Sequence, residues 1–294
     1  MSVNPVFLEL PDLVSLKEQV ENLVLPDNNK VSLTGYGDKK SPFRSRGLDF
    51  QEVRVYQPGD DIRQIDWRVT AKYGEPFTKL YTEEKEQQIY LVCDLRPNMQ
   101  FASHGHFKSV VAGRLTALSA FIAGKKKDGL AYSLLTDKIV SSLDAVGSDL
   151  IPSLLNQLTE KPTENSGITF SDAIFQLGHH LKIGASLILF SDFYDLGEKE
   201  LKVLGQLGQK NTVTFIHIYD EMERNLPTES LPYSDGKESF MMNGKSARKA
   251  FRASWEEQTN LLRENVQKYG LGYLALATDS PYLNLYNQFC WGKR

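Results

Sequence analysis

From residue 88 onward, short apolar stretches alternate with longer amphipathic ones, and this rhythm limits the possible folds more than any other feature. Strand-sized apolar stretches occur at residues 88–93, 129–135, 139–143, 186–190, 213–218 and 273–277. Apolar residues at helical spacing predict helices at residues 107–123, 149–158, 171–181, 198–207 and 246–269. Strands separated by helices of this length connect by right-handed β-α-β crossovers. We therefore predict an α/β fold: a doubly wound, mostly parallel sheet with helices on both faces.

The beginning of the chain does not follow this rhythm. Apolar residues recur at helical spacing between Pro11 and Pro26, which predicts one amphipathic helix whose apolar stripe packs on the body of the protein. A polar, glycine-rich stretch at residues 35–45 predicts a loop. We expect two domains, namely a small helix and strand annex over residues 1–86 and the α/β domain over residues 87–294.

Composition argues against several classes of protein. The formal net charge is −3, whereas a nucleic-acid-binding chain usually has a basic excess, so we expect no nucleic-acid partner. No apolar stretch approaches the roughly 20 residues that cross a bilayer, and no secretory signal pattern is visible at the beginning of the sequence. Cys93 and Cys290 are too few for a disulfide framework in a chain of 294 residues. We expect a cytoplasmic protein without a transmembrane segment.

The common catalytic and nucleotide-binding motifs are absent from the sequence. Residues 244–246 read Gly-Lys-Ser, but the glycine that a phosphate-binding loop needs five positions earlier is missing. Two histidine pairs could in principle hold a metal, His104 with His106 and His179 with His180. No cysteine or acidic cluster adjoins them in sequence, so solvated surface histidines are the favoured interpretation. We expect no catalytic residues and no cofactor.

One segment concentrates turn residues and opposed charges. Proline and glycine at positions 58 and 59 favour a turn. The charged and aromatic residues that follow are Asp60, Asp61, Arg63, Asp66, Trp67 and Arg68. They could form an acid/base or anion-binding site. The favoured interpretation is a partly buried ion-pair network that holds the turn on the body, with Trp67 as its hydrophobic pin, because catalytic carboxylates usually need a cleft.

Polar side chains follow two of the predicted strands. Asp94 follows the first strand of the α/β domain, Asp192 follows the central one, and Thr169 lies in a loop before a helix. Open α/β sheets bind ligands at the carboxyl ends of their strands, where the strand order reverses. Oxygen-bearing side chains at such a place suit a hard divalent cation such as Mg²⁺.

Both groups of residues resemble patterns of known families. Residues 94–98, Asp-Leu-Arg-Pro-Asn, stand in the place of the D-x-S-x-S motif of the metal-ion-dependent adhesion site in von Willebrand factor A domains, and Thr169 and Asp192 match its threonine and distal aspartate. Residues 56–67, Y-x-P-G-D-D-x-R-x-I-D-W, resemble the signature of the bacterial domain-of-unknown-function fifty-eight family. The signature residues are Tyr56, Pro58, Gly59, Asp60, Asp61, Arg63, Asp66 and Trp67. The resemblance extends from about residue 35 onward.

This resemblance implies a von Willebrand A-like body and a partnership with a MoxR-type AAA+ ATPase, beside which such proteins are typically encoded. Both serines of the adhesion motif are absent here, because Arg96 and Asn98 replace them. Arginine offers only donors and a permanent positive charge. We therefore expect no bound metal and a guanidinium that reaches back to Asp94; the alternative is that Arg96 points into solvent toward a partner's carboxylate. If a cation binds, its expected ligands are Asp94, Asn98, Thr169 and Asp192.

Three functions are compatible with these patterns. The favoured one is a non-enzymatic, chaperone-like adaptor that binds the MoxR-type ATPase and a client protein through Asp94, Arg96, Asn98, Thr169 and Asp192. The second is an enzyme that uses Asp60, Asp61, Arg63 and Asp66. The third is a domain of the Mg²⁺-dependent adhesion type with an intact ligand site.

Overall fold

The computed structural model describes residues 4–23, 48–57, 62–83, 87–143, 149–160, 167–178, 180–227, 230–234 and 239–291. The chain divides into two compact units, one formed by Met1–Asp38 with Gln87–Arg294 and the other by Lys39–Glu86. The smaller unit ends at residue 86, where the boundary was expected. The expected annex over residues 1–86 is nevertheless divided, because the amino-terminal helix α1 (Leu10–Glu21) belongs to the larger unit.

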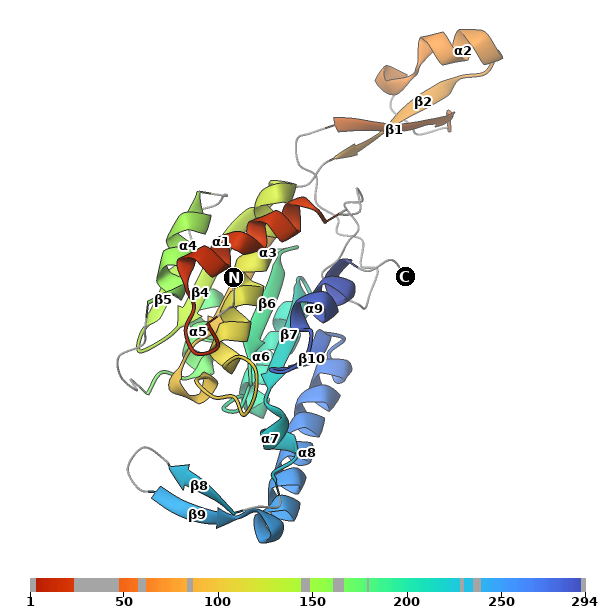
Figure 1. The fold of residues 1–294 in the computed structure, drawn as a ribbon. Coiled ribbons are helices and arrows are strands. Elements are labelled where there is room, and N and C mark those ends of the chain that lie inside the picture. The colour runs from red at the N-terminus through yellow and green to blue at the C-terminus, as the bar shows by residue number, and fades with distance from the viewer. Residues whose placement is uncertain are drawn as a thin grey trace. The chain divides into compact units, whose positions relative to one another are not determined.

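The larger unit is built on a six-stranded sheet (Figure 1). Its strands are β3 (Gln88–Asp94), β4 (Gly129–Leu135), β5 (Ile139–Ser142), β6 (Ser186–Ser191), β7 (Thr212–Tyr219) and β10 (Gly272–Ala277). They lie in the order β10-β7-β6-β3-β4-β5, and neighbours are parallel except for β4 and β5. The order reverses between β3 and β6, so the switch point lies between these two strands. The predicted doubly wound, mostly parallel architecture is confirmed.

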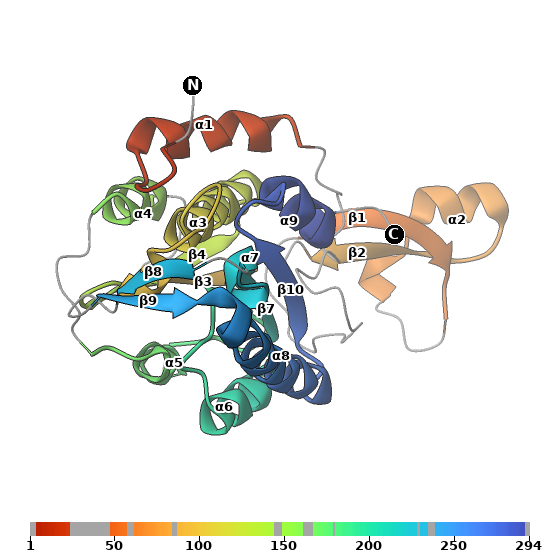
Figure 2. The same cartoon turned by 60° about the horizontal axis from the view of Figure 1, so that its bottom comes forward.

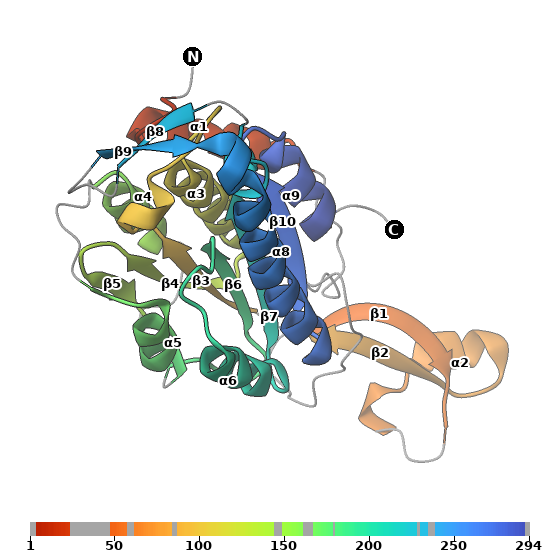
Figure 3. The same cartoon turned by 90° about the horizontal axis from the view of Figure 1, so that it is seen from below.

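Helices cover both faces of this sheet (Figures 2 and 3). One face carries α1, α3 (Lys108–Lys126), α4 (Leu150–Leu158) and α9 (Tyr282–Trp291). The other carries α5 (Phe170–Gly178), α6 (Glu198–Gly208) and α8 (Gly244–Lys268). Successive residues of β3 enter alternate cores, Leu91 the first and Val92 the second, because side chains alternate across a strand. This explains why the strands are apolar without interruption.

Helix α1 packs against α3, as its apolar stripe predicts. The stripe consists of three buried residues, Leu13, Leu16 and Val20. Arg114 of α3 donates to both carboxylate oxygens of Asp12 at 3.0 Å. The ammonium group of Lys125 donates to three carbonyl groups at the end of α1, where the helix leaves its last carbonyls without partners. These contacts, which the boundary at residue 86 would sever, attach α1 to the α/β body.

The smaller unit contains β1 (Leu48–Val55), β2 (Phe77–Glu83), a 3-10 turn (Ile62–Gln64) and α2 (Trp67–Tyr73). Its two strands are antiparallel, with a bulge between Phe50 and Glu52. In the larger unit, α7 (Glu221–Arg224) and the hairpin of β8 (Ser230–Ser234) and β9 (Ser239–Asn243) connect β7 to α8. Among the helices of the described residues, none is long and apolar enough to cross a membrane.

Candidate functional site

At the switch point, Arg96 holds the buried carboxylate of Asp94. Asp94 ends β3 and is 0% exposed, and Arg96 is 7% exposed. Arg96 Nε donates to Oδ1 of Asp94 at 2.9 Å and Nη2 donates to Oδ2 at 2.8 Å, which is the bidentate geometry that suits a guanidinium. The Ser191 hydroxyl at the end of β6 also donates to Oδ2, at 2.7 Å. The prediction that Arg96 reaches back to Asp94 is confirmed, and the alternative in which it points into solvent is wrong.

A second carboxylate, Asp195, binds the same guanidinium. Arg96 Nη1 and Nη2 donate to its two oxygens at 2.6 and 3.0 Å, and Nη1 also donates to the carbonyl of Ile168 at 3.1 Å. The backbone N–H of Phe170, at the start of α5, donates to Asp195 at 3.0 Å. Arg96 therefore ties the end of β3 to the loop before α5 and to the loop after β6. Sequence reasoning missed Asp195, whose only signal was its place three residues after Asp192.

Asp192 is paired with a buried lysine. Lys108 begins α3 and is 1% exposed. Its Nζ donates to Asp192 at 2.8 Å and to Glu223 of α7 at 2.5 Å. Asn98 Nδ2 donates to Asp192 at 3.1 Å, so the asparagine amide, and not its carbonyl, faces the carboxylate. No local pattern indicated Lys108 or Glu223, because a lysine at the start of a helix usually lies in solvent.

Thr169 lies beside this network, but its hydroxyl serves a helix cap. The hydroxyl and the backbone N–H of Thr169 both donate to Asp172 at 2.8 Å. The Asp172 N–H is 3.3 Å from the threonine hydroxyl, so the pair caps the start of α5 reciprocally. Thr169 was expected to be a ligand beside Asp94 and Asp192, but its hydroxyl binds Asp172 instead.

Two internal cations thus pair with four carboxylates at this edge of the sheet. Burial raises the pKa of Asp94, and the Arg96 guanidinium acts against that rise. Burial alone would raise the pKa of Asp195, but the hydrogen bonds from Arg96 and the Phe170 N–H hold that pKa below its usual value. Burial lowers the pKa of Lys108, but its two carboxylates raise it above the ordinary value overall. A lysine and an arginine that remain charged leave Mg²⁺ no unclaimed carboxylate here, so these residues do not fit the adhesion-type metal site.

The loop after β6 has a left-handed backbone at Phe193. Its φ is 55°, which is uncommon for an aromatic residue and costs about 1–3 kcal/mol. The ring of Phe193 is buried against those of Phe170 and Phe215, with centroids 5.5 and 5.1 Å away. This packing sustains the strained turn. The next residue, Tyr194, is 72% exposed, whereas Asp195 turns back into the network.

Behind this loop lies a buried histidine of β7. His217 is 5% exposed, and its Nδ1 is 2.7 Å from the Tyr273 hydroxyl. Burial lowers the pKa of His217 to about 4; Asp192 opposes this shift, and Lys108 and Arg263 add to it. The imidazole is therefore neutral at physiological pH.

The described part of the smaller unit contains only some of the signature residues. Pro58, Gly59, Asp60 and Asp61 lie outside the described residues, so the catalytic interpretation of that cluster stays a prediction. The backbone N–H of Tyr56 donates to the Pro76 carbonyl at 2.8 Å, next to the β1 and β2 pairing. Arg63 is exposed in the 3-10 turn.

Asp66 is the N-cap of α2. Its carboxylate accepts from the N–H groups of Arg68 and Val69 at 3.0 and 3.2 Å. Trp67 is 67% exposed. Within its own unit the Trp67 ring is not covered, and the expectation that it pins the turn to the body stays a prediction. Asp66 does have the predicted structural role, but through a helix cap.

The other candidate ligands are dispersed. His104 and His180 are exposed, and His179 lies outside the described residues. Cys93 and Cys290 are free thiols buried in one core. Among the residues that the structure describes, no three His, Cys, Asp or Glu side chains are grouped so that they could hold a metal.

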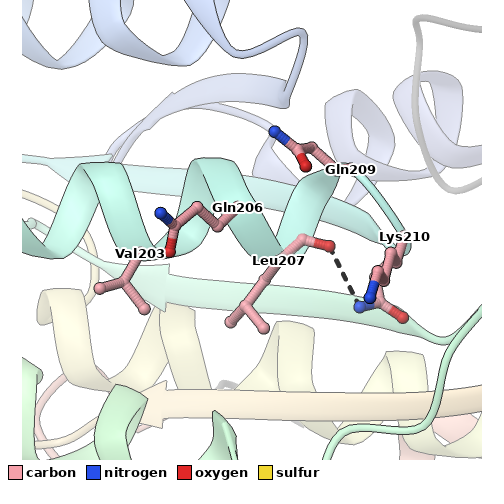
Figure 4. A pocket seen from close by; sticks show the side chains of 6 residues that line it. Val203, Gln206, Leu207, Gln209 and Lys210 are labelled. Carbon is pink, nitrogen blue, oxygen red and sulfur yellow. Dashed lines mark hydrogen bonds between the residues drawn. The ribbon is translucent and has the colours of Figure 1, made fainter.

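A cavity of about 430 Å³ lies away from the switch point (Figure 4). It is lined by Val203, Gln206, Leu207, Gln209, Lys210 and Asn211, which belong to α6 and the segment before β7. Asn211 Nδ2 donates to the Leu207 carbonyl at 3.1 Å. This is the amino end of β7, and its aliphatic and amide lining offers no acid or base beyond Lys210. A smaller cavity of about 140 Å³ adjoins Leu95 and Gln100.

A family model described as protein of unknown function DUF58 matches residues 52–265. The chain belongs to this family. The match includes the whole signature segment, residues 56–67, and the whole Arg96 and Lys108 network. Three mycobacterial proteins are similar along most of the chain: the uncharacterized proteins Mb1516 of Mycobacterium bovis, and MT1527 and Rv1480 of Mycobacterium tuberculosis. Each is 23% identical over 276 residues, which cover 91% of this chain and 86% of the relative.

Solved structures of low identity are also similar. An aerotolerance-related membrane protein from Bacteroides fragilis is 12% identical with a TM-score of 0.45, over 69% of this chain and 98% of that one. The RO (RSR) protein of Deinococcus radiodurans is 11% identical with a TM-score of 0.36, over 72% and 35%. Likeness at this level carries no argument about what the chain binds.

Proposed function

We propose that this DUF58 protein is a non-enzymatic binding module whose partner docks at the carboxyl-end edge of the sheet, around the β3 and β6 switch point. The internal pairing of the carboxylates supports this proposal most. Asp94, Asp192 and Asp195 occupy the place where open α/β sheets bind ligands, but Arg96 and Lys108 hold them. Such carboxylates are poor bases, nucleophiles and metal ligands, because each role needs an unclaimed oxygen.

The same pairs make this edge a fixed surface. They join the loop after β3, the loop before α5, the loop after β6 and α7. Two aromatic side chains lie exposed on these loops, Phe101 at 41% and Tyr194 at 72%. Exposed aromatic residues on rigid supports are typical centres of protein interfaces, since they bury large area at little entropic cost.

For the partner we propose a MoxR-type AAA+ ATPase, together with a client protein that the pair helps to assemble or mature in the cytoplasm. The support is the resemblance of residues 56–67 to the signature of a family whose members are typically encoded beside such ATPases.

Co-purification of the full chain with the neighbouring ATPase tests the proposal, with and without ATP and Mg²⁺. We expect Tyr194→Ala to lower retention at least about tenfold, as removal of a central aromatic residue does at an interface. Asp192→Ala should also lower it, because the loop loses its contact with Lys108. The matched control is Ile183→Ala, which changes a 59% exposed side chain just before β6, at the opposite end of the sheet. Equal retention of all three variants would place the interface elsewhere.

A further inference from the structure

A stretch within the amino-terminal half of α8 has no buried face. Every residue from Arg248 to Ser254 is exposed, over about two helical turns, whereas a helix of a folded domain normally buries one apolar stripe. Phe251 lies in this stretch with 41% of its surface exposed. Figure 1 shows this part of α8 near α7 and the β8 and β9 hairpin, beyond the ends of β7 and β10.

The remainder of α8 is attached to the body in the ordinary way. Thr259, Leu262 and Val266 are buried at helical spacing. At the border between the two halves, the Trp255 ring packs on Tyr219 with 5.6 Å between centroids. The exposed half is therefore a continuation of a firmly held helix.

The exposed stretch of α8 carries an excess of positive charge. Arg248, Lys249 and Arg252 lie near the amino terminus of α8, and its first turn has no acidic residue. These cations lie beyond the first turn of α8 and are exposed. Arg252 pairs with Glu256 at 2.8 Å. Among the described residues, Arg248 and Lys249 form no ion pair.

We propose that this half of α8 docks on a partner protein that presents carboxylates beside an apolar patch. The partner's carboxylates would pair with Arg248 and Lys249, and its apolar patch would cover Phe251, as in helix-in-groove recognition. A polyanionic nucleic acid or membrane fits less well, because Glu256 and Glu257 follow within a turn and the chain's net charge is −3. The surface is separate from the Arg96 network, so it does not depend on the function proposed above.

A photo-crosslinking amino acid at position 251 tests this inference in the full chain, expressed in its native host. The matched control carries the same group at Phe175 of α5, which is 74% exposed. We expect a protein adduct at position 251 and not at 175, joined to a peptide that contains Asp or Glu within about four residues of apolar side chains. Arg248→Glu with Lys249→Glu should reduce the adduct at least tenfold. Arg248→Lys with Lys249→Arg should preserve it.

The charge-reversed chain also separates docking from folding. It should melt close to the native temperature, because both replaced side chains are exposed. Loss of the adduct together with retained melting supports the proposal. An adduct with a second copy, with residues 39–86 of the same chain, with nucleic acid or with lipid overturns it. The proposal is also overturned if the adduct yields at positions 251 and 175 are equal, or if the charge reversal does not change the adduct yield at position 251.

Discussion

Arg96 and Lys108 place two positive charges among carboxylates that are largely withdrawn from water. Charges in such a setting remain stable only while they are paired, because an unpaired buried charge has lost its hydration without gaining a counter-charge. The sequence could predict the contact between Arg96 and Asp94, since they are two positions apart in the chain. Asp195 and Lys108 required the fold, because their partners lie 99 and 84 residues away along the chain.

Replacing Arg96 with serine should lower the free energy of unfolding by about 3–5 kcal/mol, because Asp94 keeps its burial and loses its counter-charge. Chemical denaturation measures this, and Arg96→Lys, which keeps the charge without the bidentate contact, should fall in between.

In calorimetry the native chain should give no heat with Mg²⁺, and Arg96→Ser with Asn98→Ser should gain weak binding. Tight Mg²⁺ binding by the native chain would contradict a site whose carboxylates are already paired with Arg96 and Lys108.

His217 should make the fold sensitive to mild acid. Burial lowers its folded-state pKa to about 4 from an ordinary 6.5, so between these pH values only the unfolded chain takes up the proton. The contribution of neutral His217 to the free energy of unfolding is complete above pH 6.5. It is lost as the pH falls toward 4, by roughly 3 kcal/mol in total. Denaturation at pH 7 and pH 5 should show a smaller loss for His217→Asn than for the native chain. A control at the exposed His104 should behave as the native chain; equal losses in all three would exclude this histidine as the cause.

At the scale of elements, the strands of the sheet agreed with prediction to within one or two residues, because uninterrupted apolar stretches bounded by turn residues have few alternatives. The prediction placed the end of α5 at residue 181, but the helix ends at Gly178. The error arose because Leu181 continues the apolar spacing past the residue where the helix ends. Helix α2 was missed because it buries no residue and so has no apolar stripe. Its caps, Asp66 and the left-handed Gly74, were the available signal.

The cap of α2 gives a prediction at this scale. Asp66→Ala should destabilise the helix by about 0.5–2 kcal/mol, because the N–H groups of Arg68 and Val69 lose their acceptor. Hydrogen exchange should then accelerate across residues 67–73. Asp66→Asn retains an acceptor oxygen and should exchange almost as slowly as the native chain. Unchanged exchange in the alanine variant, together with lost function, would instead favour the catalytic interpretation of the signature.

At the scale of the whole molecule, the boundary of the larger unit depends on contacts between segments far apart in sequence. Periodicity identified α1 and its apolar stripe, but its position on α3 is set by the Asp12 and Arg114 pair, 102 residues apart. Local patterns carry no information on such a pairing. For this reason the chain could be assigned its fold class from sequence, while the division at residue 86 was wrong for α1.

Two shortened chains test this division. A chain in which residues 39–86 are replaced by a flexible Gly-Ser linker retains α1, and we expect it to melt close to the native temperature. A chain that begins at residue 87 loses the buried contacts of Leu13, Leu16 and Val20 and leaves Arg114 without Asp12. Each such leucine contributes about 2–5 kcal/mol, so its melting temperature should fall by at least about 10 °C. Leu16→Ala in the full chain should lose about 2–5 kcal/mol by the same mechanism. If both shortened chains melted alike, α1 would contribute nothing to the α/β body, and the boundary at residue 86 would be restored.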